Sequence, residues 1–247
     1  MPYTMTISPD FKPELIAGWY IFNTWLQKKI DTNIHINMVN DFNELSKTID
    51  SGSIDLIYAN PCDIAKLVRE KSFTPIAKPV GCQDETIIIT NSKTSDIHIE
   101  SLKSGLKVAQ TDVPDVNTIG MIMLEPADIS PDDIEVIPCS NYITVAKKVI
   151  NGEADIGFLL ADAYGEFTKL VKNQVQPIIT SKIHVLHHAL LAGPNFSNIQ
   201  ALQEAVLTMQ NDTSGTGILK SLELEKWERM DLDEAEFLID LIDTLSP

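Results

Sequence analysis

The sequence has few cysteines, and their spacing defines no site. Cys62, Cys82 and Cys139 are odd in number, lie far apart and form no C-x-x-C pair. This spacing gives no support to a zinc site or a redox motif, and it leaves open a disulfide between two of the three. The favoured interpretation is that all three are small buried apolar residues.

Long uncharged apolar runs are also missing. None approaches the ~20 residues that span a bilayer, and the chain does not open with the pattern of a secretory signal peptide. Met1-Pro2 leads directly into a predicted strand. Two origins fit: a native cytosolic protein, or a mature exported chain whose signal was replaced by an initiator Met. We expect a periplasmic protein, with the cytoplasm as the alternative.

Positive charge is scarce. The chain has 19 Lys and Arg against 35 Asp and Glu, a formal net charge of −16. A surface this acidic repels phosphate backbones and anionic lipid headgroups, so neither nucleic acid nor a membrane surface is an expected partner. The simplest interpretation of the charge is solubility.

Motifs of catalysis are absent as well. The sequence contains no G-x-S-x-G, no P-loop, no G-x-G-x-x-G and no H-E-x-x-H. Carboxylates are numerous, but in a chain this acidic their number does not indicate a catalytic site. We therefore expect no enzyme activity, no metal and no organic cofactor.

What the sequence does contain is an alternation of strand and helix patterns. Residues 14–30 carry apolar side chains at helical spacing, and Asn60-Pro61 has the pattern of an N-cap followed by proline at the first helical position. Asp41 with Glu44 resembles a capping box, and Gly52 offers a stop for that helix. We expect further helices starting near Asn117 and Asn141, and at 199–210, 216–222 and 232–245. The predicted strands are 3–8, 33–38, 54–59, 75–80, 85–91, 107–111, 135–139, 156–161 and 184–190.

This alternation predicts an α/β architecture with largely parallel sheets. The strands at 85–91 and 182–190 are the two places where the chain can cross between lobes. We expect residues 1–88 with 186–247 to form lobe I, and residues 89–185 to form lobe II. Such a discontinuous layout puts a cleft between the lobes and hinges in the crossing segments.

Three segments in succession carry a family resemblance. They are IDLIYANP at 54–61, AQTD at 109–112 leading to NTIG at 117–120, and NGEADIG at 151–157. Their order and spacing resemble the phosphate/phosphonate-type solute-binding proteins of ABC transporters, which have the type II periplasmic-binding-protein fold. SPD at 8–10 and NDTSG at 211–215 also sit where that family has similar residues, so the resemblance runs over essentially the whole chain.

The resemblance implies a ligand site. In that family a Ser-Thr-Ser-Gly turn at a helix N-terminus holds the anion through backbone N–H groups and the helix dipole. In this sequence NTIG at 117–120 stands at the position of that turn, and Thr118 carries its single hydroxyl group. The alternative is that Asn117 only caps a helix and binds no ligand. Asp162 matches an acidic residue that receives the ligand's amino group in some aminophosphonate binders. The predicted contacts are Tyr58, Asn60, Asp84, Thr86, Asn117, Thr118, Ile119, Gly120, Asn141, Asp162 and His188.

The departures from the family pattern concern charge. Anion-holding hydroxyls are reduced, while Asp84, Asp115 and Asp162 add negative charge near the predicted cleft. A zwitterion, an amine or a neutral polar solute therefore fits better than a strongly anionic phosphonate.

The three histidines His184, His187 and His188 suggest a metal site, but the predicted strand conformation argues against one. Along a strand, His184 and His188 share a face but lie about 13 Å apart, too far for one zinc ion, while His187 points to the opposite face. A polar ligand contact by His188 or His187 is the better functional prediction.

These observations favour a monomeric binding protein that captures a small polar solute by hinge closure and delivers it to a membrane permease. Two alternatives remain open at this point. One is a cytosolic enzyme on the same fold, and the other is a sensory ligand-binding domain of a larger receptor.

Overall fold

The computed structural model describes residues 2–95 and 97–245, and the chain divides into two compact units. Met1–Gln83 and His187–Asp243 form unit 1, and Asp84–Leu186 forms the body of unit 2. No helix in the described ranges is long and apolar enough to cross a membrane.

Unit 1 is built on a six-stranded sheet of order β11-β4-β10-β3-β1-β2. The strand β1 pairs in parallel with β2 and β3, whereas β10 runs antiparallel to β3 and β4, and β11 antiparallel to β4. The strand bounds are β1 Tyr3–Ile7, β2 Ile34–Met38, β3 Leu56–Ala59, β4 Thr74–Pro79, β10 Ala189–Ala192 and β11 Trp227–Arg229.

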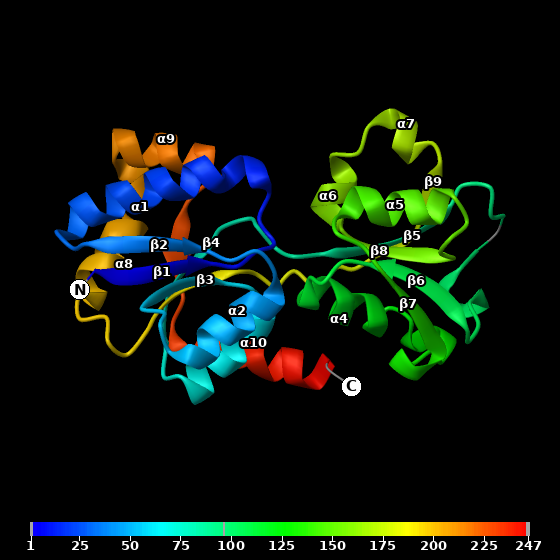
Figure 1. Cartoon of the computed structure of the whole chain (residues 1–247), viewed down its shortest axis with the longest axis horizontal. Coiled ribbons are helices and arrows are strands. Elements are labelled where there is room, and N and C mark those ends of the chain that lie inside the picture. The colour runs from blue at the N-terminus through cyan, green and yellow to red at the C-terminus, as the bar shows by residue number, and fades with distance from the viewer. Residues whose placement is uncertain (1, 96, 246–247) are drawn as a thin grey trace. The chain divides into compact units, whose positions relative to one another are not determined.

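Helices cover both faces of this sheet. In Figure 1, α1 and α9 lie on one face, while α2 and α10 lie on the other. The helix bounds are α1 Ile16–Ile30, α2 Phe42–Ser51, α3 Pro61–Ala65, α8 Ile199–Leu207, α9 Thr213–Ser221 and α10 Leu232–Leu245, with 3-10 turns at Pro13–Leu15 and Met209–Asn211 and a π turn at Lys66–Glu70.

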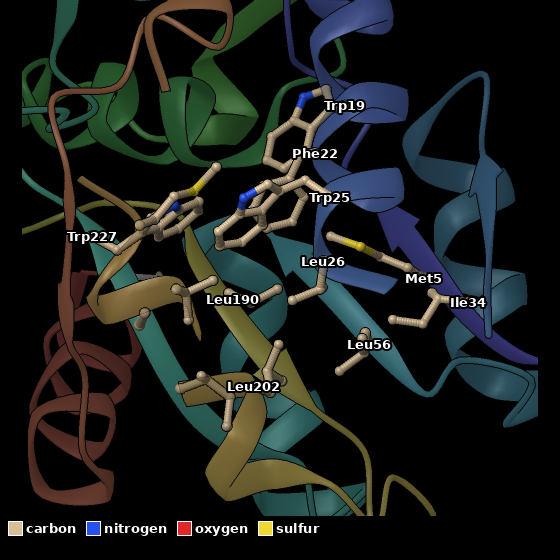
Figure 2. Packing of buried hydrophobic residues seen from close by; sticks show 14 of the residues in the cluster. Met5, Trp19, Phe22, Trp25, Leu26, Ile34, Leu56, Leu190, Leu202 and Trp227 are labelled. Carbon is tan, nitrogen blue, oxygen red and sulfur yellow. The ribbon is translucent and has the colours of Figure 1, made fainter. Parts of the chain in front are cut away.

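The core of unit 1 is aromatic. Trp19, Phe22 and Trp25 from α1 lie beside Trp227 of β11, with Leu190 from the middle of the sheet close by (Figure 2). All five are buried, and the tryptophans and Phe22 contribute the largest apolar areas to the packing. The amphipathic pattern at residues 14–30 therefore predicted α1 and most of its buried face, although Ile16 at its start is exposed.

Unit 2 is built on a five-stranded sheet of order β7-β6-β8-β5-β9. The strand β6 pairs in parallel with β7 and β8, whereas β5 runs antiparallel to β8 and β9. In Figure 1, α5 lies on one face and α4 on the other. The bounds are β5 Thr86–Asn91, β6 Leu106–Gln110, α4 Pro114–Ile122, β7 Ile134–Pro138, α5 Tyr142–Ile150, β8 Ile156–Leu160, α6 Ala161–Gly165, α7 Lys169–Lys172 and β9 Val175–Thr180, with 3-10 turns at Ile99–Ser101, Glu125–Ala127 and Pro131–Asp133.

The structure confirms the α/β class and corrects four details of the sequence prediction. The sheets are mixed rather than mainly parallel, because β5 and β10 oppose their neighbours. Residues 182–188 form no regular strand, and His184 has a left-handed φ of 59°. The helix predicted to start near Asn117 starts at Pro114. Two strands, β9 and β11, were not predicted.

Candidate functional site

The topology of unit 1 brings polar residues together at one edge of its sheet. Parallel strands β1 and β3 end at the same edge, and the antiparallel β10 begins there, because Ala189 pairs with Ala59. Asp10, Asn60 and His188 therefore meet, although Asp10 and His188 are 178 positions apart. In α/β sheets this carboxyl edge is where ligands bind.

Asp10 and His188 form a buried pair. His188 Nε2 lies 2.9 Å from Asp10 Oδ2, and the side chains are 15% and 6% exposed respectively. Asn60 Nδ2 donates to the same carboxylate oxygen at 2.8 Å. Burial alone would raise the pKa of Asp10, but the charge of His188 and the hydrogen bonds from His188 and Asn60 outweigh it and lower the pKa. The geometry thus favours an ionised Asp10.

The start of α3 adds a second carboxyl group to this edge. Asn60 caps α3 by accepting from the N–H of Cys62 at 2.9 Å, as the Asn60-Pro61 pattern predicted. Asp63 follows in the first turn. Burial, with the nearby charge of Asp10, raises the pKa of Asp63 to about 6. Its Oδ2 is buried, and no described residue donates a hydrogen bond to it, so this carboxylate lacks the usual compensation for burial.

Aromatic rings fix Tyr58 beside this pair. The Tyr58 ring stacks on His188 at a centroid distance of 5.1 Å and an angle of 19°. On its other sides it meets Trp19 at 4.7 Å and Trp227 edge-on at 5.9 Å. We name Asp10, Tyr58, Asn60, Asp63 and His188 the unit 1 edge set.

Unit 2 follows the same rule. Its parallel strands β6, β7 and β8 end at one edge, and β5 starts there, because Thr86 pairs with Leu160. The loops and first helical turns after these strands carry most of the predicted contacts. We name Asp84, Asn117, Thr118, Asn141 and Asp162 the unit 2 edge set.

The helix α4 differs from the predicted anion turn. Because it begins at Pro114, the Asn117 N–H donates to the Val113 carbonyl within the helix at 3.2 Å and is not offered to a ligand. Proline at the first position has no N–H to offer. Asp115 in that first turn is buried. The alternative of an Asn cap is also wrong, because Val113 occupies the N-cap position.

Two members of the predicted turn serve packing. The side chain of Ile119 is fully buried. A Cβ at Gly120 would lie 2.4 Å from the Phe158 ring, so α4 sits against that ring only because residue 120 has no side chain. Neither offers a side-chain contact at the surface of unit 2, and of the four residues only Asn117 and Thr118 are partly exposed.

Of three further predicted contacts of unit 2, one is buried and two are exposed. Thr86 is fully buried, and its hydroxyl donates to the Val116 carbonyl at 3.2 Å. Asn141 is exposed and caps α5 by accepting from the Thr144 N–H at 2.9 Å. Asp162 is exposed in the first turn of α6.

In the part of the chain that the structure describes, no group of three or more histidine, cysteine or acidic side chains could hold a metal ion. Cys62, Cys82 and Cys139 are half-buried rather than fully buried as predicted, and they form no disulfide with one another. His184 is exposed, whereas His187 is buried with Nδ1 3.1 Å from the His188 carbonyl oxygen. That the protein works without a metal stays a prediction.

Sequence reasoning singled out Tyr58, Asn60 and His188 but not the two carboxylates beside them. Asp10 lies in the family-like segment SPD at 8–10, and no sequence pattern pointed to Asp63. Both lie within four residues of the end of a parallel strand, so extending the strand-end rule to the first turn of the following helix finds them.

The comparisons with known proteins place this architecture in one class. The PhnD1 protein of Prochlorococcus marinus in complex with methylphosphonate superposes with a TM-score of 0.80 at 12% identity, over 98% of this chain and 97% of that one. A binding protein component of an ABC phosphonate transporter from Pseudomonas aeruginosa gives 0.77 at 14% identity, over 99% and 87%. The periplasmic aliphatic sulphonate binding protein SsuA of Escherichia coli gives 0.66 at 13%, over 98% and 91%. No curated protein matches the sequence.

These similarities show the fold: a type II periplasmic-binding-protein architecture. The family itself is shown by the sequence, because the family model described as "ABC transporter, phosphonate, periplasmic substrate-binding protein" matches residues 5–235. The chain belongs to this family. It is a solute-binding protein of an ABC transporter and not an enzyme, as the resemblance implied.

Proposed function

We propose that the solute is held by both edge sets, one from each unit, and that the protein closes around it by a hinge motion. Two observations support this. Each edge set lies at the carboxyl edge of its sheet, where α/β proteins bind ligands. The chain passes between the units at 83/84 and again at 186/187, and these two segments can serve as a hinge. We propose that lobe I (residues 1–88 with 186–247) and lobe II (residues 89–185) of the sequence prediction are the two parts that move.

The charges of the edge sets favour a zwitterion, an amine or a neutral polar solute over a strongly anionic one. The unit 1 edge set carries two carboxylates against one imidazole, and the unit 2 edge set adds Asp84 and Asp162. At the start of α4 the Asn117 N–H is used within the helix, and Pro114 has no N–H to offer. A phosphonate that also bears an ammonium group would fit both the acidic edge sets and a family described as phosphonate-binding.

The observation that carries the proposal is the buried Oδ2 of Asp63, to which no described residue donates a hydrogen bond. A buried acceptor without a donor destabilises the protein, and a solute that supplies an N–H or O–H to this edge lowers that cost. A simple dianion has no donor to offer, and it would lie beside Asp10 and Asp63.

Calorimetry with two probes tests this. 2-Aminoethylphosphonate and methylphosphonate differ by the ammonium group, and we expect the first to bind at least about tenfold more tightly. Asp162→Asn should reduce that preference, since a lost charge partner weakens a cationic group by about tenfold or more. The control Asp132→Asn changes the same charge in the turn before β7, at the opposite end of the strand. Equal or tighter binding of methylphosphonate would refute the charge argument.

We further propose that the protein works as a monomer and delivers its solute to a membrane permease of the same transporter. For an exported mature chain the periplasm is the expected site. A single species of monomer mass in sedimentation experiments, with and without 2-aminoethylphosphonate, is the expected result, and a stable dimer would contradict it.

A further inference from the structure

Glu85 connects the two segments through which the chain passes between the units. It lies just after the first passage, and its side chain is 14% exposed. One carboxylate oxygen accepts from the Ser181 hydroxyl and from the Ile183 N–H, the latter at 3.2 Å. The other accepts from the His184 N–H at 2.7 Å and lies 3.3 Å from His184 Nδ1. One side chain thus binds four groups of the second segment.

These contacts begin where the sheet stops. The β5–β9 ladder ends at the pair Ile87 and Thr180, and residues 181–188 have no regular structure. The N–H groups of Ile183 and His184 are therefore bound by Glu85 rather than by a neighbouring strand. His184 adopts a left-handed φ of 59°, which a non-glycine residue keeps only when surrounding contacts fix it.

Short backbone contacts complete the junction. Ser181 N–H donates to the Thr86 carbonyl at 2.8 Å, and Thr86 N–H donates to the Ser181 hydroxyl at 2.9 Å. Asp84 N–H donates to the Leu186 carbonyl at 2.8 Å. The two passing segments are thus bound together from residue 84 to residue 86.

The same junction contacts the helices that carry the unit 2 edge set. The Glu85 carbonyl accepts from the Ala161 N–H, at the start of α6, at 2.7 Å. The Thr86 hydroxyl donates to the Val116 carbonyl in the first turn of α4. A displacement of residues 85–86 would therefore move the first turn of α6, which carries Asp162, and the first turn of α4, which precedes Thr118.

We propose that Glu85 is a hinge clamp: it binds the two passing segments into one element and so sets the range of motion between the units. Glu85 is a positioning residue that acts through the backbone of 181–186. The proposal rests on hinge closure as part of the proposed function. A carboxylate is required, because its oxygens accept from several donors at once, whereas the amide nitrogen of glutamine would face the N–H groups as a second donor.

The test uses ligand-free protein, so it does not depend on which solute binds. Glu85→Gln is compared with wild type, with the exposed control Glu100→Gln in the same unit, and with Ser181→Ala, which removes one of the Glu85 contacts together with the hydrogen bond from the Thr86 N–H. Hydrogen exchange of the peptide 181–186 should be about tenfold faster in Glu85→Gln, intermediate in Ser181→Ala and unchanged in Glu100→Gln.

The second measurement follows the units themselves. Spin labels attached to ketone-bearing residues at positions 47 and 169, one in each unit, leave the native cysteines unlabelled. The interspin distance distribution should be broader in Glu85→Gln than in wild type and the control. Unchanged exchange, or an unchanged distribution, would overturn the clamp. Absence of phosphonate binding by the wild type would instead refute the proposed solute, so the two failures are distinguishable. Ser181→Ala serves as the folded test if Glu85→Gln does not fold.

Discussion

Replacing Asp63 by asparagine should make unit 1 more stable at neutral pH. In the unfolded chain this carboxyl group ionises near 3.8, whereas in the folded protein burial and the charge of Asp10 raise its pKa to about 6. The folded state therefore holds the Asp63 proton more tightly than the unfolded state. Stability consequently falls as pH rises from 3.8 to about 6 and stays reduced above that range.

The magnitude follows from the difference between the two pKa values. A difference of about two pH units corresponds to about 3 kcal/mol of unfolding free energy once Asp63 is fully ionised. Asp63→Asn removes this ionisation and keeps the shape of the side chain. We expect the variant to be more stable than wild type by about 2–3 kcal/mol at pH 7.5, and the two to be nearly equal at pH 4.

Tryptophan fluorescence during urea unfolding provides the assay. The three tryptophans, Trp19, Trp25 and Trp227, all lie in unit 1, so the signal reports the unit that contains Asp63. Bound solute must first be removed by unfolding and refolding, because a retained ligand would stabilise the folded state. A stability difference that is the same at pH 4 and pH 7.5 would refute the reasoning, since packing effects of the amide do not depend on pH.

Two further predictions concern the metal and the packing of α4. Chelator treatment should leave the melting temperature unchanged, because no described group of side chains is arranged to hold an ion; a drop of several degrees would reveal a site. Gly120→Ala should destabilise unit 2 by about 1–3 kcal/mol, because its Cβ would meet the Phe158 ring at 2.4 Å. Gly165→Ala, whose Cβ meets nothing within 4 Å, is the control, and an equal loss of melting temperature in both would contradict the packing argument.

The features that sequence predicted well are those whose cause is local. Asp41 accepts from the Glu44 N–H at 2.7 Å and begins α2, and Gly52 ends it with a φ of 68°. Asn60 and Asn141 cap α3 and α5 in the same way. In each case the capping residue and the helix end that it caps lie within a few residues of each other, so the local sequence is enough to predict the cap.

Errors arose where a distant partner decides the conformation. Residues 184–188 have strand-like composition, but Glu85, almost a hundred positions earlier, binds the N–H of His184. The short strand β11 exists only because β4 supplies its pairing edge. The start of α4 is a different kind of error. Pro114 is a local signal for the first helical position, but the resemblance of NTIG to a family turn pointed to a later start.

The edge sets show how far a simple topological rule reaches. Strand ends are visible in sequence and predict that Tyr58 and Asn60 lie at this edge, whereas Asn141 is predicted by the family resemblance. The sequence does not predict the charge state of the edge sets, because it depends on pairing between strands that the chain order separates. His188 meets Asp10 only after β10 inserts between β3 and β4. That insertion leaves Asp63 beside an Asp10 that is already bound to His188 and Asn60. The selectivity we propose therefore follows from strand order rather than from any motif, and relatives that share the motifs can differ in the solute they hold.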